Sequence, residues 1–226
     1  MVKNELPCLT RQVLLFLALF LPFISSHLSA QERRPGDLFP PDKIFLLEEP
    51  RDWQDTEEIM ERLHLKAGDI VADIGAGSGY FTIPLASRVG EKGMVFAEDI
   101  QIEMINYISK KVEALELKNV RVIFGKVEDP SLLDNFFDLV FLANTYHELG
   151  KPILLLENIR KVLRYHGRLA IIDWDPAKKS PFGPPVEEKI AEDTVIKELE
   201  RVGFELIDKH NFMPYHYFLV FKKKKD

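Results

Sequence analysis

Three glycines and one aspartate carry the clearest chemical signal in this 226-residue sequence. Gly75, Gly77 and Gly79 form a glycine-rich turn between an apolar run that ends at Ile74 and a helical stretch. Glycine lets the backbone turn sharply and approach a ligand, and the N-terminus of the following helix lies behind it. Asp99 lies 20 positions after Gly79, where a carboxylate can accept hydrogen bonds from both hydroxyls of a ribose. The pattern predicts a site for a ligand that contains a nucleoside.

The residues around the turn narrow the choice of ligand. The dinucleotide fingerprint is G-x-G-x-x-G/A, but bulky Tyr80 stands here at the third small position. No Arg or Lys lies in the turn to meet a pyrophosphate, and Asp73 adds negative charge just before it. This charge favours a ligand that carries an ammonium or sulfonium group. A turn that is glycine-rich only because it is tight is the alternative, but it does not explain why Asp73 and Asp99 accompany the glycines.

Alternating strand-like and helical segments are expected to position these groups. Apolar runs predict strands over Ile70–Ile74, Met94–Ala97, Val120–Phe124, Phe137–Ala143 and Arg168–Asp173. Helical stretches cover Thr56–Leu63, Gly79–Val89, Gln101–Leu115, Pro152–Leu163 and Val186–Val202. This alternation implies a parallel sheet covered by helices on both faces. Phe204–Phe212 and His216–Phe221 are joined by a link so short that only an antiparallel pair is permitted.

Composition and charge limit the kinds of partner. The chain is 46% apolar and 29% charged, with a formal net charge of -6 and no basic stripe, so we expect no nucleic-acid partner. Cys8 is the single cysteine, which excludes a disulfide framework and any multi-cysteine metal site. No H-x-x-x-H or clustered carboxylate spacing is present, and we expect no metal.

These motifs together resemble those of the class I S-adenosylmethionine-dependent methyltransferases, a large Rossmann-like family. The resemblance covers residues 55–221, and the matching segments are Val71–Gly79, Ala97–Ile100, Gly125–Asp129, Phe137–Val140 with Asn144, and Gly167–Ala170. It implies an α/β three-layer sandwich with a seven-stranded, mostly parallel sheet and an antiparallel C-terminal strand. It also implies S-adenosyl-L-methionine as the methyl donor and a small-molecule acceptor, which the sequence does not identify.

The resemblance assigns cofactor contacts residue by residue. The implied cofactor-binding residues are Asp73, Gly75, Ala76, Gly77, Gly79, Asp99, Ile100, Val127, Glu128 and Asn144. The backbone of Gly75 and Gly77 would meet the methionine part of the cofactor. Asp73 would orient this part directly or through water, and Asn144 would line it with its carbonyl.

A second group of residues would bind the ribose and the adenine. Asp99 would hold the ribose hydroxyls, and Ile100 would pack on the adenine. Val127 and Glu128 would border the adenine edge. Lys126 stands where the family often has Asp, so the adenine amino group would bind Glu128 or Asp129 instead.

Glu98 precedes Asp99 directly, so two acids compete for the ribose. Successive side chains of a strand point to opposite faces. We therefore expect Asp99 to face the ligand and Glu98 to face away from it.

Three strand ends offer candidates for the acceptor side, because ligands sit beyond the carboxyl ends of the strands in open parallel sheets. They lie at residues 144–148, at 173–175 and, if the strand that precedes it runs parallel to the others, at 210–216. We predict that Tyr146 lines the pocket and that His147 acts as a catalytic base. A structural hydrogen bond is the alternative for His147. Deprotonation matters only for an acceptor that is protonated at the working pH.

Two further segments border this side. An N-terminal arm that contains Arg51–Gln54 could fold over the cofactor and exclude water, although a capping segment with Trp53 as a hydrophobic anchor is the alternative. The proline-rich loop at 176–185 is short and stiff, so it leaves a small lid or none.

Two other function classes remain open. One is a non-catalytic cofactor- or partner-binding domain of the same fold, and the other is a nicotinamide-dependent oxidoreductase. The D/N-P-P-Y/F signature of methyltransferases that act on exocyclic amines is absent from residues 144–147, which disfavours DNA bases as acceptors.

The first thirty residues are unlike the rest. Val13–Ile24 is a run of twelve apolar residues between a basic start and a tail of small residues, which is typical of a secretory signal peptide. The uncharged stretch of 19 positions also leaves an uncleaved anchor open. We expect export to the periplasm after cleavage, or membrane association through residues 13–30. Export would separate the enzyme from a cofactor made in the cytosol, whereas an anchor with the domain on the cytosolic side would not.

The domain plan follows from these segments. Residues 1–30 are expected to be the signal peptide or anchor, 31–54 a linker and N-terminal arm, and 55–226 the methyltransferase domain. The oligomeric state is not determined by the sequence.

Overall fold

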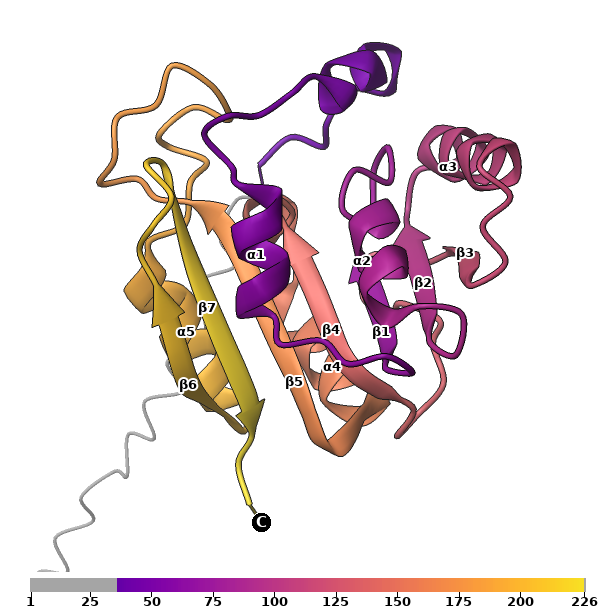
Figure 1. Ribbon diagram of the computed structural model, residues 1–226. Helices are drawn as coiled ribbons and strands as arrows, with labels where there is room; N and C mark the ends of the chain where they lie inside the picture. The colour runs from indigo at the N-terminus through magenta and orange to yellow at the C-terminus, as the bar shows by residue number, and fades with distance from the viewer. Residues whose placement is uncertain (1–35, 226) are drawn as a thin grey trace, which may run out of the picture. The chain divides into compact units, whose positions relative to one another are not determined.

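The computed structural model describes residues 36–225 (Figure 1). The predicted signal peptide or anchor therefore lies outside the described residues. None of the helices within 36–225 has both the length and the apolar character needed to cross a bilayer.

Seven strands form a single sheet. They are β1 (Ile70–Ile74), β2 (Met94–Asp99), β3 (Val120–Phe124), β4 (Phe137–Ala143), β5 (Leu163–Trp174), β6 (Phe204–His210) and β7 (His216–Lys223). Their order is β3-β2-β1-β4-β5-β7-β6. Strands β1 to β5 pair in parallel, and β7 is antiparallel to both of its neighbours. The predicted fold class and the antiparallel terminal pair are both confirmed.

The direction of β7 decides where the last turn lies. Because β7 is antiparallel to both β5 and β6, β6 runs in the same direction as β1 to β5. The β6–β7 turn therefore joins the carboxyl ends of the other strands at one edge of the sheet. The condition attached to the third acceptor candidate, residues 210–216, is met.

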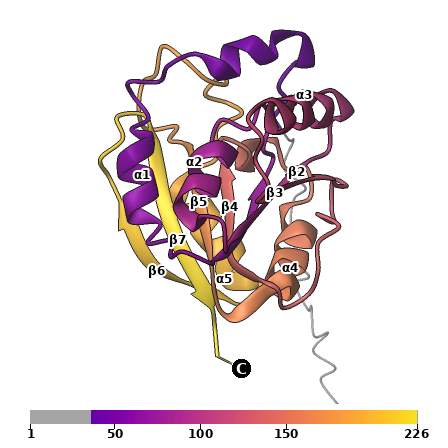
Figure 2. The ribbon, with the colours of Figure 1, turned by 45° about the vertical axis from the view of Figure 1, so that its right-hand side comes forward.

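Helices cover both faces of the sheet (Figures 1 and 2). Helices α1 (Thr56–Arg62), α2 (Thr82–Val89) and α3 (Ile102–Ala114) pack on one face, and α4 (Pro152–Val162) and α5 (Glu192–Arg201) pack on the other. Neighbouring strand residues enter opposite cores, as with Val71 on the α1–α3 side and Ala72 on the α4–α5 side. This double burial explains why the strands read as continuous apolar runs.

Two short 3₁₀ helices lie at the carboxyl edge. One is η1 (Pro41–Glu48), in the N-terminal arm, for which the sequence predicted no helix or strand. The other is η2 (Tyr146–Glu148), directly after β4. Figure 1 shows the arm, in indigo, passing above the arrowheads of the parallel strands.

Several boundaries differ from the sequence prediction. Helix α5 begins at Glu192 and not at Val186, because residues 186–191 are still part of the loop that follows the prolines. Strand β5 already begins at Leu163, where a helix end was expected, because Leu163 pairs with Phe137 of β4 across a register shift. Strand β2 extends to Asp99.

Candidate active site

The glycine-rich turn joins β1 to α2 and lies beside the end of β4. Gly75 has φ +69° and Gly77 has φ +56°, conformations that side-chain-bearing residues rarely adopt. A Cβ on Gly75 would lie 2.4 Å from Cγ2 of Thr145, just after β4. Thr145 therefore occupies the space that a side chain at position 75 would need, and the turn brings its backbone against the β4 end.

Three carboxyl groups gather around this turn. Asp73 accepts a hydrogen bond from the Thr82 hydroxyl (2.6 Å) at the start of α2. Asp99 accepts from the backbone amides of Gly77 (2.9 Å) and Gln101 (2.9 Å). The Glu98 carboxyl accepts from the amide of Gly75. The first two acids were predicted site residues, and the structure brings both of them to the turn.

Glu98 does not face away from the turn, as the alternation argument expected. A Cβ on Gly125, just after β3, would overlap its Oε1 at 1.5 Å, so the carboxyl lies over a glycine. The missing side chain at Gly125 leaves room for Glu98 to bend toward the Gly75 amide. Alternation describes where a side chain leaves the strand, but a long side chain at a strand end can turn back.

Burial raises the pKa of all three acids. It raises the pKa of Asp73 to about 7, against the Thr82 hydrogen bond that lowers it. Burial and the nearby Asp99 raise the pKa of Glu98 well above its ordinary value. Burial also raises the pKa of Asp99, although its backbone hydrogen bonds oppose the shift. Ionised carboxylates are costly here unless a positive charge accompanies them, so the site favours a cationic ligand.

The predicted adenine-edge residues lie on the surface after β3. Ile100 follows β2 and is partly buried, whereas Val127 is 54% exposed. Glu128 forms an ion pair with Lys151. Lys126 and Asp129 close a small backbone bridge around them. The structure places these residues beyond the β3 end without bringing the side chain of Glu128 to the turn.

The N-terminal arm lies across the cofactor side of the edge. A Cβ on Gly77 would meet Leu47 of η1 at 3.2 Å, so the arm touches the glycine turn itself. The backbone amide of Phe39 donates to Oε1 of Glu148 (3.2 Å), and the backbone carbonyl of Phe39 accepts from the Gln101 side chain (3.2 Å). The arm is thereby tied to the segments after β2 and β4, on either side of the turn.

Gln54 and Asn144 meet at the end of the arm. Gln54 is buried, and its Oε1 accepts from Nη1 of Arg51 (3.1 Å) and from Nδ2 of Asn144 (3.4 Å). Within residues 36–225, Gln54 Nε2 and Asn144 Oδ1 are buried without a hydrogen-bond partner. One unpaired donor and one unpaired acceptor therefore lie close together beside the turn.

His147 forms a buried pair with Asp173 at the end of β5. Its Nδ1 lies 2.8 Å from Oδ1 of Asp173, and its backbone amide donates to Oδ2 (3.0 Å). Burial lowers the pKa of His147, but the Asp173 carboxylate outweighs it and the net shift is upward. The same pair lowers the pKa of Asp173 despite its burial. Burial raises the pKa of Glu148, whose Oε1 lies 3.9 Å from His147 Nε2, to about 7.

Tyr146 does not lie where the sequence placed it. Its side chain is fully buried in the core on the α4–α5 side, and its hydroxyl donates to Glu198 (2.6 Å) of α5. The η2 turn sends neighbouring side chains in different directions, so Tyr146 enters the core while His147 reaches the end of β5. The pocket-lining role predicted for Tyr146 does not fit this position.

Aromatic rings from four segments pack together around the end of β5 and the β6–β7 turn. This aromatic cluster consists of Trp53, Trp174, Phe182, Tyr215 and His216. The Trp53 ring stacks on His216 at 5.3 Å and on Phe182 at 5.7 Å, and His216 packs on Trp174 at 4.1 Å. Burial lowers the pKa of His216 to about 3, so its ring stays uncharged and contributes a flat, weakly polar surface.

Comparison with known proteins identifies the family. The family model described as a methyltransferase domain matches residues 65–218. The chain belongs to this methyltransferase family. The crystal structure of a SAM-dependent methyltransferase from Aquifex aeolicus is similar with 37% identity and a TM-score of 0.78, over 81% of this chain and 98% of that one. A putative type 11 methyltransferase from Sulfolobus solfataricus, at 24% identity and a TM-score of 0.62 over 78% and 94% of the two chains, shares the fold.

Curated relatives match over a shorter stretch. A demethylmenaquinone methyltransferase from Bacillus mycoides (strain KBAB4) is 31% identical over 117 residues, which are 52% of this chain and 49% of that protein. Similar enzymes from Bacillus cereus strains are 29% identical over the same length. The chain spans about half the length of the curated relatives it matches.

The candidate site fits S-adenosyl-L-methionine, the methyl donor of this family. The buried carboxyl groups favour a cation, and the unpaired atoms at Gln54 and Asn144 offer a donor and an acceptor to an amino-acid group. A nucleoside held at Asp99 of β2 can run along the turn toward Asn144 after β4, because β1 lies between these two strands.

The sequence identified the segments that form the site, but it did not show which of their residues contact each other. It identified Arg51–Gln54 and residues 173–175 as candidates, but not the contact of Gln54 with Asn144 or the pairing of Asp173 with His147. It also missed that Phe182 from the proline-rich loop packs on Trp53 of the arm. No local pattern signals such pairs, because their members are far apart in the chain.

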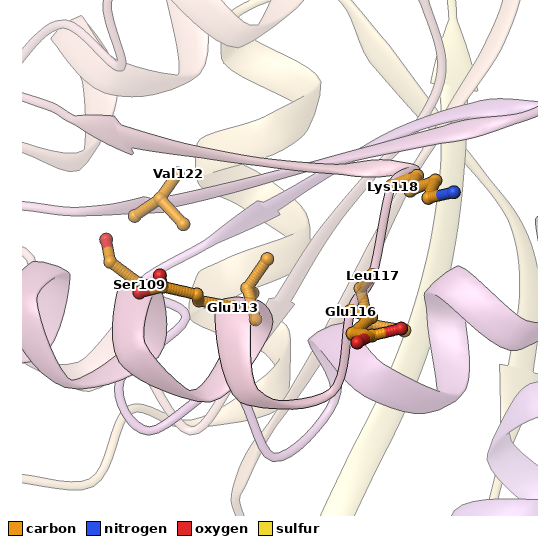
Figure 3. Close-up of a pocket in the computed structure, with 7 residues that line it drawn as sticks. Ser109, Glu113, Glu116, Leu117, Lys118 and Val122 are labelled. Atoms are coloured by element: carbon orange, nitrogen blue, oxygen red, sulfur yellow. The ribbon is translucent and has the colours of Figure 1, made fainter.

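A shallow surface depression lies away from this site. It is lined by Ser109, Val112, Glu113, Glu116, Leu117, Lys118 and Val122 (Figure 3). These residues belong to the C-terminal half of α3, the loop after it and β3. None of them follows the carboxyl end of a strand, so the depression is separate from the candidate active site.

Proposed function

We propose that the methyltransferase transfers the methyl group of S-adenosyl-L-methionine to a small hydroxylated aromatic compound. The observation that carries this proposal is the buried His147–Asp173 pair at the carboxyl edge, where Asp173 directly precedes Trp174 of the aromatic cluster in the chain. The pair offers a proton acceptor, and the cluster offers a flat apolar surface. An acceptor with an ionisable hydroxyl on an aromatic ring uses both.

The cofactor side depends on the glycine turn and its acids. When bound, S-adenosyl-L-methionine supplies an electrophilic methyl group on a positively charged sulfur. Asp99 would hold the ribose hydroxyls, and the backbone of Gly75 and Gly77 would border the methionine part. Asp73 would favour the positive charge, because a nearby cation stabilises its ionised form. Orientation of donor and acceptor contributes about 7–11 kcal/mol in well-aligned systems.

His147 would act as the base. Its Nδ1–H donates to Asp173, which leaves Nε2 as the nitrogen that accepts a proton. The proton of the acceptor hydroxyl would move to Nε2 while the oxygen takes the methyl group, and the electrons of the broken S–CH₃ bond would stay on the sulfur of S-adenosylhomocysteine. Because Asp173 raises the pKa of His147, activity should rise with pH until the imidazole is neutral.

The relatives are compatible with such an acceptor. The Bacillus enzymes are named demethylmenaquinone methyltransferases, which is compatible with an acceptor that contains a ring. The match covers half of their length, so the ring class and not the individual compound is what we transfer to this chain.

Residues 1–30 are proposed to export the methyltransferase or to anchor it to a membrane. The basic start, the apolar run and the small-residue tail support this proposal. Fractionation of cells that produce the full chain, followed by protease accessibility, tests it. A full-length protein that stays in the soluble cytosolic fraction would contradict both alternatives.

The acceptor class is tested with methyl-labelled S-adenosyl-L-methionine. Hydroxylated aromatic compounds should become labelled, whereas aliphatic amines and DNA should not. Phe182→Ala should raise the KM for the acceptor while leaving the affinity for S-adenosylhomocysteine unchanged, since Phe182 touches the aromatic cluster and is exposed at the loop. If the protein binds S-adenosylhomocysteine but labels none of the compounds, it is a non-catalytic binding domain or acts on another class.

A further inference from the structure

The carboxyl edge carries exposed apolar side chains that belong to neither core. They lie on the N-terminal arm and on the proline-rich loop between β5 and α5, and they are 41% to 61% exposed. This apolar rim consists of Leu38, Phe45, Leu46, Phe182 and Val186. We propose that the apolar rim binds the surface of a lipid bilayer and that the acceptor enters the site from the lipid. The inference rests on the proposed function and adds to it the phase that supplies the acceptor.

The arm and the loop meet at this edge. Figures 1 and 2 both show them beyond the arrowheads of the parallel strands. A Cβ on Gly36, at the start of the arm, would lie 3.2 Å from Oε2 of Glu188 in the loop. At the other end of the arm, the Trp53 ring stacks on Phe182 at 5.7 Å. The exposed apolar side chains of both segments therefore border the same edge of the sheet.

The charges of the arm limit the kind of surface that the rim can bind. Residues 36–54 contain five acids and two bases, and the whole chain has a formal net charge of -6. Attraction to anionic lipids or to a phosphate backbone comes from clusters of Lys and Arg, which the arm lacks. Apolar contact is what the rim offers, and a group of exposed apolar side chains on one edge is typical of a contact with a protein or a membrane.

The part of the chain before Gly36 favours a bilayer over a second protein. Val13–Ile24 is a run of twelve apolar residues, and eleven residues separate Ile24 from Gly36. The Gly36 amide donates to the His147 carbonyl (2.9 Å), so the described part of the chain begins at the carboxyl edge. Eleven residues extend over at most about 40 Å. A bilayer that takes up the apolar run would therefore be joined to the protein at the edge that carries the apolar rim.

The rim would add a second contact to this anchor. A single modest apolar anchor binds a membrane only reversibly, whereas two contacts together give stable association. Phe182 belongs both to the apolar rim and to the aromatic cluster, so the lipid contact and the acceptor side share a residue. An acceptor with a hydroxylated ring and an alkyl tail fits this arrangement, because its ring can lie on the cluster while its tail stays in the lipid.

The chain contains its own probe for this contact. Trp53 and Trp174 are its two tryptophans, and both belong to the aromatic cluster beside Phe182. Bromine atoms on lipid acyl chains quench tryptophan fluorescence at close range. Full-length protein mixed with brominated phosphatidylcholine vesicles should therefore lose fluorescence, whereas vesicles of unbrominated phosphatidylcholine should leave it unchanged. Replacing part of the lipid by anionic phosphatidylglycerol should not increase the quenching, because the arm is acidic.

A rim variant and a matched control separate the edge from the anchor. Phe45→Ser combined with Val186→Ser should lose at least about half of the quenching, because burial of each of these side chains contributes about 5-fold to 20-fold to binding. Tyr165→Ser is the control, since Tyr165 is 62% exposed but lies near the start of β5, at the opposite edge of the sheet. This variant should be quenched like the wild type. All three proteins should float with the vesicles to the same extent, because residues 1–30 are unchanged.

The entry route of the acceptor is tested with two phenols. The rim variant should raise the KM for 4-dodecylphenol dissolved in the vesicles about 5-fold or more. The KM for phenol in solution should stay within about twofold, because neither Phe45 nor Val186 belongs to the site. An equal change for both phenols would overturn the entry from the lipid.

The remaining outcomes are distinct. Wild-type protein that floats with the vesicles but is not quenched would mean that the carboxyl edge faces away from the lipid. Equal quenching of the wild type and the rim variant would mean that the rim is not the contact, and wild-type protein that does not float would mean that it binds no lipid. Wild type that is not quenched but forms dimers that the rim variant does not form, as light scattering would show, would assign the rim to a second copy of the chain.

Each of these results overturns the inference while the proposed function stands. Quenching needs no turnover, so its measurement does not depend on the acceptor. A protein that is quenched as expected but methylates neither phenol would overturn the proposed function and the entry route, and the lipid contact would stand.

Discussion

Replacing Asp73 by Asn should flatten the pH dependence of cofactor binding. Asp73 is buried under the glycine turn, and burial raises its pKa to about 7. A positively charged ligand binds the ionised form, so binding should strengthen as the pH rises through this pKa. Asn keeps the size of the side chain and can still accept the hydrogen bond of the Thr82 hydroxyl.

The magnitude follows from the fraction of ionised Asp73. With a pKa of about 7, roughly 9% of the carboxyl groups are ionised at pH 6 and roughly 91% at pH 8. If only the ionised form binds, the affinity rises about tenfold between these two pH values, or about 1.4 kcal/mol. Burial and the nearby Asp99 also raise the pKa of Glu98 well above its ordinary value.

Calorimetry with S-adenosyl-L-methionine from pH 6 to pH 8 measures this effect as the ratio of wild-type to Asp73→Asn affinity. The ratio cancels the titration of the ligand and of Glu148, which both proteins share. Thr82→Val is the matched control, since loss of the hydrogen bond should raise the pKa of Asp73 further and move the transition to higher pH. A ratio that is constant over the whole range would refute the reasoning.

The stability of the ligand-free protein should show the opposite trend. Between about pH 4 and pH 7 the folded Asp73 keeps its proton, whereas the unfolded chain has lost it. The free energy of unfolding therefore falls as the pH rises through this window, by up to about 4 kcal/mol from Asp73. Urea unfolding at pH 5 and pH 8 should show a smaller loss for Asp73→Asn than for wild type.

Two further variants test the geometry of the site. Gly75→Ala places a Cβ against Thr145 at a residue with φ +69°, so it should destabilise the fold by about 1–3 kcal/mol and weaken S-adenosylhomocysteine binding, as thermal unfolding and calorimetry would show. A fully stable variant with wild-type affinity would contradict this. Asp173→Asn should lower kcat by about 10²-fold or more and move the pKa of the pH–rate profile downward, because Asp173 positions His147 and raises its pKa. The S-adenosylhomocysteine affinity should stay within about twofold, and an unchanged pH profile would show that His147 is not the base.

The fold could be predicted from local patterns. Apolar runs such as Ile70–Ile74 and Phe137–Ala143 became strands with the predicted bounds, because strands covered on both faces are largely apolar. The short link between β6 and β7 allowed only an antiparallel pair. Boundaries failed where tertiary pairing decided them, as at Leu163, which joins β5 through its contact with Phe137.

Part of the candidate site could also be predicted from local patterns. The glycine turn and Asp99 are neighbours across adjacent parallel strands, so their spacing in the chain reflects their distance in space. Tyr146 shows the limit, since one 3₁₀ turn decides whether a residue after β4 faces the core or the edge. Glu98 shows a second limit, since its side chain can turn back only because Gly125, just after β3, leaves space for it.

The sequence by itself determined the parallel sheet, the position of the glycine turn and the place of Asp73 and Asp99 beside it, because each depends on residues that are close in the chain or lie on adjacent strands. Only the tertiary structure decided that Gln54 meets Asn144, that Asp173 holds His147 and that burial brings the pKa of Asp73 to about 7. These properties arise when segments far apart in the chain exclude water from one another. Desolvation depends on what covers a group, and the sequence around that group does not contain this information.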